Sequence, residues 1–234
     1  MNVDAIIDRL FQALVGGNRL EARQIVDETR ASGVSAEQIT HDVLWPLLET
    51  ANQLYRTDQL TNLAHHYATR LLRSLLDQQQ AQYTQRPARD STILMFCGEA
   101  EADELAGLLA ADILEADGYN VFFAGGGVAN DEILGEIGRR RPDTLLMFAS
   151  GPSDAPNIRV LIDHIRDVGA NPEMQIVVGG GIFNRAEGLA EEIGADQWAK
   201  TPEQLIAKLS EEGQKRATPE QRTVGRSRRA GQAA

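Results

Sequence analysis

The sequence predicts an α/β protein in which a bundle of four helices precedes a doubly wound parallel sheet of five strands. Two observations predict it: apolar residues recur at helical spacing up to about Thr84, and afterwards short apolar runs alternate with amphipathic segments. A chain of 234 residues has room for two modest domains. We expect a bundle at 1–84, a linker at 85–91, a sheet domain at 92–212 and a tail at 213–234.

Four helical segments make up the first region. The first, 3–14, carries one apolar stripe, and "GGN" ends it; the second, 20–31, stops at "SGVS". Ser35 begins the third helix as an N-cap, and Gln38 completes a capping-box pattern. Pro46 predicts a kink in that helix, and the fourth runs from about 60 to 81. Short connections between four helices are typical of a compact bundle.

Five apolar runs follow the linker "YTQRPARDST". They read "TILMFCG", "NVFFAGG", "DTLLMFAS", "QIVVGGG" and the weaker "ADQWAK", and 10 or more residues of helical pattern separate most of them. Nearly continuous apolar strands alternating with helices indicate a flavodoxin-like parallel sheet that is covered on both faces. Ligands of such sheets bind beyond the carboxyl ends of the strands, where this chain is rich in glycine and other small residues.

Charge and composition narrow the class of protein. The net charge is −11, but 215–234 holds six basic residues and one acid, so this end is +5 and the rest −16. A basic nucleic-acid footprint over the whole chain is therefore excluded, and we expect the tail to be disordered. An acidic N-terminus and the lack of a 20-residue apolar stretch predict a cytoplasmic protein with no membrane span. The single cysteine, Cys97, is interpreted as a small core residue.

The strand ends exclude two common ligand chemistries. A response-regulator receiver needs a phosphoacceptor aspartate at the end of the third strand, where this chain has Ser150. The segments "GGGVAND" and "GGGIFNR" fit neither G-x-G-x-x-G nor the Walker pattern after a first strand. Acids at Glu99 and Glu101 would moreover repel a phosphate.

A helical bundle joined to a flavodoxin-like domain resembles the cobalamin-binding module of methionine synthases, corrinoid carrier proteins and B12-dependent photoreceptor regulators. The resemblance covers about residues 3–209. The bundle is most similar to the photoreceptor type, with Tyr55 at the position of that family's Trp and His65-His66 at its Glu-His pair. In the sheet domain, "VVGGGIFNRAEGLAEEIGAD" is similar to the family's Gly-Gly segment and its later "GAD", and Ser150 matches its serine after the third strand. The resemblance implies the cofactor-binding residues Tyr55, His65, His66, Gly98, Glu99, Glu101, Ser150, Gly179, Gly180 and Gly181.

The stretch "CGEAEADELAG" departs from that family. The family has D-x-H-x-x-G after the first strand, and its histidine binds cobalt from below; here Glu99 takes the Asp position, Glu101 the His and Glu104 the Gly. A carboxylate is a harder and weaker partner for cobalt in a corrin than imidazole, so the usual histidine ligation is not expected. Acids in the first turn of a helix also interact favourably with its dipole, so part of this charge needs no ligand.

Three functions remain open. The first is a non-catalytic sensor or regulatory protein that binds cobalamin, or a related corrinoid or tetrapyrrole, without the lower histidine. The second is an interaction module that keeps the fold without its ligand, and the third, a corrinoid methyl carrier, is disfavoured by Glu101. We find no nucleophile-base pair and no metal-ligand cluster, so we expect no enzymatic activity and no catalytic or metal-ligating residues. No DNA-binding segment precedes the bundle, so the output would pass through a protein partner or a homo-oligomer.

Overall fold

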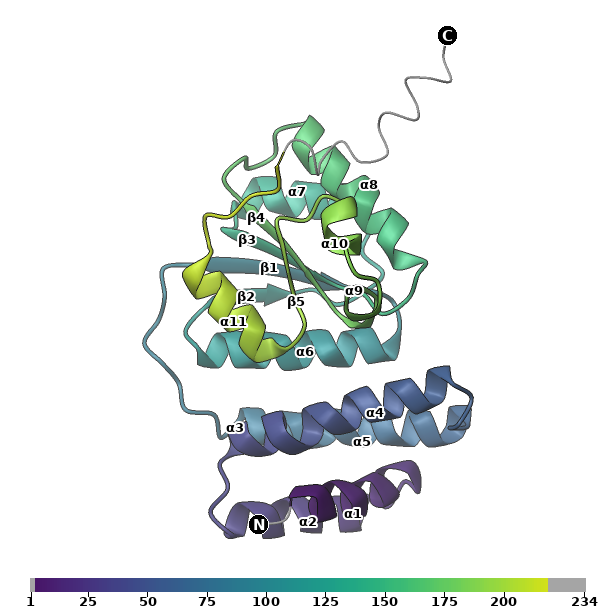
Figure 1. Cartoon of the computed structure of the whole chain (residues 1–234). Helices are drawn as coiled ribbons and strands as arrows, with labels where there is room; N and C mark the ends of the chain where they lie inside the picture. The colour runs from purple at the N-terminus through teal and green to yellow at the C-terminus, as the bar shows by residue number, and fades with distance from the viewer. Residues whose placement is uncertain (1–2, 219–234) are drawn as a thin grey trace. The chain divides into compact units, whose positions relative to one another are not determined.

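The computed structural model describes residues 3–218 and divides the chain into two units, Met1–Gln85 and Arg86–Ala234. The predicted disordered tail lies largely outside the described residues. The first unit is helical throughout, and Figure 1 labels its elements. These are α1 (Val3–Val15), α2 (Arg19–Ala31), α3 (Ala36–Ile39), the π-helical turn η1 (Thr40–Leu44), α4 (Trp45–Arg56) and α5 (Asn62–Gln80).

Side-chain caps set the helix boundaries of this unit. The Ser35 hydroxyl accepts from the Gln38 N–H, and the Gln38 side chain accepts from the Ser35 N–H, which confirms the predicted capping box. Thr61 caps α5 in the same way through the N–H of Ala64. The third predicted helix is continuous from α3 to α4, with the wide turn η1 directly before Pro46. Leucines and isoleucines from all four helices form the core, among them Leu10, Leu14, Ile25, Ile39, Leu44, Leu47, Leu72 and Leu75.

The second unit is a five-stranded parallel sheet with the order β2-β1-β3-β4-β5, which confirms the predicted fold class. Its strands are β1 (Thr92–Cys97), β2 (Asn120–Phe123), β3 (Thr144–Phe148), β4 (Gln175–Gly179) and β5 (Gln197–Ala199). Its helices are α6 (Glu101–Ala116), α7 (Asn130–Arg140), α8 (Asp154–Asp167), α9 (Gly181–Arg185), α10 (Leu189–Glu192) and α11 (Pro202–Glu211).

Helices cover both faces of the sheet (Figure 1). One face packs Ile93, Met95 and Leu146 against α6 and α11, and the other packs Leu94, Met147 and Val178 against α7, α8 and α10. Burial on both faces explains why the strands are apolar at nearly every position. Because all five strands run parallel, their carboxyl ends lie along one end of the sheet, which we call the carboxyl edge. Their amino ends lie along the opposite end, the amino edge.

A buried carboxylate, that of Asp117, forms ion pairs with the first residues of the second unit. Asp117, which follows α6, accepts from the guanidinium of Arg86 at 2.5 Å and from that of Arg89 at 2.6 Å. The backbone N–H groups of Arg86 and Arg89 also donate to the carbonyls of Ala116 and Gly118. Part of the predicted linker is thus held against the sheet unit, which fixes the point at which β1 begins.

Among the described residues, no helix is long and apolar enough to cross a membrane.

Candidate functional site

The carboxyl edge brings together segments that are far apart in the sequence. Gly98 follows β1, Ser150 lies two residues after β3, and Gly180 follows β4. The strand register pairs Cys97 with Phe148 and Phe148 with Gly179, so these turns are neighbours. The N–H of Gly98 donates to the Phe148 carbonyl at 2.8 Å, which holds the first turn against the third strand.

A buried carboxyl group, that of Asp103, lies beneath these turns. Asp103 is only 2% exposed, and its Oδ1 has no hydrogen-bond partner among the described residues. A methyl group built on Gly98 would lie 2.6 Å from Asp103 Oδ2 and 3.0 Å from Asp154 Oδ2, so two carboxylates converge on this glycine. The side chain of Asp154 is itself anchored, because Oδ2 accepts from the N–H of Gly151 at 3.1 Å.

Burial raises the pKa of Asp103 above its ordinary value. Hydrogen bonds from Ser150 oppose this shift, the charge of Asp154 adds to it, and the charge of Arg185 opposes it. The Arg185 guanidinium also donates to the Ser150 carbonyl at 2.5 Å. The carboxyl edge thus brings together a partly desolvated acid, a hydroxyl, a second carboxylate and a guanidinium. Among residues 3–218, no cluster of three or more His, Cys, Asp or Glu residues could hold a metal ion.

Sequence reasoning grouped Asp103 with the exposed acids and missed its burial. Glu99 is exposed and Glu101 is half-buried, whereas Asp103 belongs to the stripe of α6 that faces the sheet. The signal was present, since Asp103, Gly107, Ala110 and Leu114 recur at helical spacing. The prediction that acids fill the first turn of α6 is confirmed for Glu101, Asp103 and Glu104.

The predicted glycine positions are covered by atoms of the chain itself. A methyl group at Gly179 would lie 2.9 Å from Cε1 of Phe148, and one at Gly180 would lie 2.5 Å from the Ala149 carbonyl oxygen. At Gly181 the nearest atom is Nη1 of Arg185, also at 2.5 Å. Internal packing therefore requires glycine at 179 and 180, whereas the Arg185 side chain could move to make room at 181. The role of these glycines in ligand binding stays a prediction.

The bundle unit brings its three predicted residues together. Tyr55, near the end of α4, stacks on His65 in α5 with ring centroids 4.1 Å apart and planes 11° from parallel. His65 is buried, and its Nε2 lies 2.9 Å from Oδ1 of Asn52. His66 meets His65 edge-on at 6.4 Å and is exposed, as its helical angle predicts. The Tyr55 hydroxyl donates to Asn62, so the stack is fixed at both ends.

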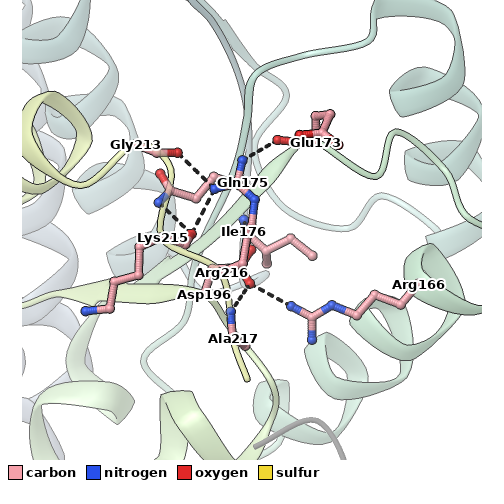
Figure 2. Close-up of polar contacts among 9 residues, drawn as sticks. All are labelled: Arg166, Glu173, Gln175, Ile176, Asp196, Gly213, Lys215, Arg216 and Ala217. Carbon is pink, nitrogen blue, oxygen red and sulfur yellow. Dashed lines mark hydrogen bonds and ion pairs between the residues drawn. The ribbon is translucent and has the colours of Figure 1, made fainter. Parts of the chain in front are cut away.

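The aspartate of the "GAD" segment, Asp196, lies at the amino edge and organises the end of the described chain (Figure 2). Its Oδ2 accepts from the N–H of Ile176 at 2.8 Å. Its Oδ1 accepts from Arg166 at 2.9 Å and from the N–H of Ala217 at 2.7 Å. The resemblance at "GAD" therefore reflects a structural acceptor that joins β4, α8 and the segment after α11.

Both units match known sequence families. Residues 91–207 match a B12 binding domain, and residues 6–78 match a second family that is also described as a B12 binding domain. The chain belongs to the B12-binding domain family. This result confirms the predicted resemblance to the cobalamin-binding module and supports a corrinoid as the ligand class, while the similarity to the photoreceptor type stays a prediction.

One solved structure shows the same fold, and two others align less closely. The monomethylamine corrinoid protein of Methanosarcina barkeri aligns with a TM-score of 0.78 at 18% identity, over 88% of this chain and 98% of its own. A cobalamin-binding protein from Desulfitobacterium hafniense DCB-2 aligns at 15% identity over 89% and 98%, with a TM-score of 0.47. The methanol:cobalamin methyltransferase complex MtaBC of M. barkeri aligns at 15% identity over 94% and 85%, with a TM-score of 0.48. No curated protein matches the sequence.

The carboxyl edge does not fit a corrinoid whose cobalt is held by a protein histidine. The only histidine after residue 85 is His164, in the last turn of α8, which leads away from the carboxyl edge. At the position where the resemblance predicts the lower histidine the chain has Glu101, and a carboxylate is a harder and weaker partner for corrin cobalt than imidazole. A corrinoid would therefore have to be held here by contacts to the ring and its side chains.

Proposed function

We propose that the chain is a non-catalytic regulatory protein that binds a corrinoid without a protein ligand on the lower face of the cobalt. The proposal is supported by the chemistry of the carboxyl edge, where the predicted alignment puts Glu99 and Glu101 at the family's Asp and His and where Asp103 is buried. Membership of the B12-binding domain family supports the corrinoid. The photoreceptor-like character rests on the cluster of Tyr55, His65 and His66.

The polar groups of the carboxyl edge suit the periphery of a corrin better than its metal. Corrin side chains are amides, which donate and accept hydrogen bonds, and both carboxylates and guanidinium groups pair with them. Arg185 is exposed and donates to the Ser150 carbonyl, which places a guanidinium group at the carboxyl edge where the corrinoid is expected. Under this proposal the chain supplies position and recognition, and it supplies no group for a reaction.

The test is to mix the full chain, uniformly labelled with ¹⁵N, with hydroxocobalamin or adenosylcobalamin and to pass it over a gel-filtration column. We expect co-elution of the corrinoid with the protein. After reduction to cobalt(II), the electron paramagnetic resonance spectrum should lack the doublet splitting that a ¹⁵N ligand from the protein would produce. Glu101→His should introduce that doublet, and Glu101→Gln, which has no imidazole, is the matched control.

Other outcomes would decide between the alternatives. Absence of co-elution with either cobalamin would contradict the proposal and leave the ligand-free interaction module. A ¹⁵N doublet in the unmodified chain would also contradict it, because a protein nitrogen would then bind the cobalt. Methyl transfer from the methylcobalamin-loaded chain to a thiol would assign the carrier function instead. The regulatory role predicts that illumination of the adenosylcobalamin complex changes its elution volume.

A further inference from the structure

The outer edge of β2 presents unpaired backbone groups. In the described sheet β2 pairs with β1 alone, on one side. Asn120 and Ala124 donate their N–H groups towards β1, to the carbonyls of Ser91 and Met95. Because successive N–H groups of a strand point in opposite directions, those of Val121 and Phe123 face the open edge. An open edge of this kind can pair with a further extended segment.

A groove of about 730 Å³ runs along this edge. Four successive residues, from Val121 to Ala124, line it, so it is bounded by the strand's edge rather than by one of its faces. Helix α6 forms one wall and α7 the other. The apolar part of the lining consists of Leu94, Phe96, Leu108, Ala111, Val121, Phe122, Phe123 and Val128.

Acids from both walls stand over the groove. Asp112 and Glu115 belong to α6, and Glu132 belongs to α7. Burial raises the pKa of Glu115, and no other group contributes to that shift. The one basic residue in the lining, Arg140, is engaged by two other lining residues: it forms an ion pair with Glu136, and its guanidinium lies 3.6 Å from the Phe122 ring centroid.

A basic segment of this chain lies within reach. The end of the described chain is fixed at the amino edge, where Ala217 binds Asp196 (Figure 2). Four arginines follow outside the described residues, and three of them, Arg226, Arg228 and Arg229, lie within four successive positions. Three strand spacings of about 4.8 Å each separate β4 from β2. Nine residues can span up to roughly 30 Å, so the distance permits contact within one chain.

The spacing of these arginines complements the acids. In an extended backbone, Arg226 and Arg228 project to one side and Arg229 to the other. The lining holds two acids on each wall, Asp112 and Glu115 on α6 and Glu132 and Glu136 on α7, and Glu136 is paired with Arg139 and Arg140. We propose that the groove between α6 and α7 binds the segment Arg226–Arg229 of the same chain, with its backbone paired to Val121 and Phe123 and its arginines facing Glu115 and Glu132.

The experiment measures amide hydrogen exchange by NMR in the full chain. In the unmodified protein the N–H groups of Val121 and Phe123 should be protected. Reversing the three charges by Arg226→Glu, Arg228→Glu and Arg229→Glu should accelerate their exchange about fivefold or more, because the pairing opens. The N–H of Phe122, which faces β1, should not change. Reversal of three exposed arginines in the bundle, Arg19→Glu, Arg56→Glu and Arg70→Glu, is the matched control and should have no effect.

A charge exchange makes the result specific. Glu115→Arg with Glu132→Arg should also accelerate the two amides, and combining this pair with the three arginine reversals should restore protection. Equal exchange rates at Val121 and Phe123 in the unmodified chain and in the triple variant would overturn the proposal. Protection that increases with protein concentration would overturn the intramolecular assignment, because a second copy would then fill the groove.

Discussion

Two buried aspartates lie at opposite edges of the same sheet, and their surroundings differ. Asp103 at the carboxyl edge and Asp196 at the amino edge are 2% and 6% exposed. The two carboxylate oxygens of Asp196 accept three hydrogen bonds, from Arg166, Ile176 and Ala217. Asp103 leaves Oδ1 without a partner and has a second carboxylate, that of Asp154, nearby. A buried acid with every partner in place stabilises the fold, whereas a buried acid that lacks partners is destabilising and marks a candidate functional position.

Substitution of the buried aspartate should lower the free energy of unfolding more at the amino edge than at the carboxyl edge. Asp196→Ala leaves Arg166 and two backbone N–H groups without their acceptor, and breaking a buried ion pair from one side costs about 3 to 5 kcal/mol. Urea unfolding followed by Trp198 fluorescence in a Trp45→Phe background would measure the loss in the sheet unit. Asp27→Ala, which removes an exposed pair with Arg30, is the control and should cost less than about 1 kcal/mol. Equal effects of the two substitutions would contradict the role of Asp196.

The next largest loss of unfolding free energy is expected from overpacking at the carboxyl edge. Gly179→Ala places a methyl group 2.9 Å from the Phe148 ring, and overpacking of this kind costs about 1 to 3 kcal/mol of unfolding free energy. Phe148→Leu should recover part of that loss in the double variant, which a double-mutant cycle would measure. Gly135→Ala in α7 meets no atom within 4 Å and should be neutral or stabilising. An unchanged unfolding free energy in Gly179→Ala would mean that internal packing does not require this glycine, which would favour a role in ligand binding.

Asp103 should make stability depend on pH. Its pKa is higher in the folded protein than in the unfolded chain, so folding favours the protonated form. The contribution of protonated Asp103 to the free energy of unfolding is fully present below the pKa of the unfolded chain, and it is lost as the pH rises through the pKa of the folded protein. Asp103→Asn should therefore gain about 1 kcal/mol over the unmodified chain at neutral pH, and the gain should vanish in acid. Chemical denaturation at several pH values would measure it; a loss of stability at neutral pH would show that the Ser150 bonds outweigh burial.

The smallest effect is expected at Arg185. This side chain is exposed, so Arg185→Gln should change the unfolding free energy by no more than about 0.5 kcal/mol. Its effect should appear instead in the affinity for cobalamin, measured by equilibrium dialysis. Unchanged affinity would remove Arg185 from the recognition surface and sharpen the contrast between the two edges further.

Much of the fold follows from patterns in the sequence. All five apolar runs became strands, and Ser35 and Gln38 form the predicted capping box, because local chemistry decides these features. The carboxyl edge was found through the topology rule for parallel sheets. The contacts at this edge depend on long-range packing. Neighbours in sequence do not reveal that Phe148 covers Gly179. They also do not reveal that Asp103 is buried while Glu99 is exposed. The pairing of Asp196 with Ala217 spans 21 residues and gives no local signal.

The π-helical turn η1 determines which way the last turns of α4 face. Such a turn accommodates one more residue than a regular helical turn, and each residue of a helix rotates the chain by about 100°. Deleting one residue between Thr40 and Leu44 would restore a regular helix and swing Tyr55 by about that angle around the axis, away from the ring of His65. The extra residue of this turn, at least eleven positions before Tyr55, is thus what brings a tyrosine in one helix face to face with a histidine in the next.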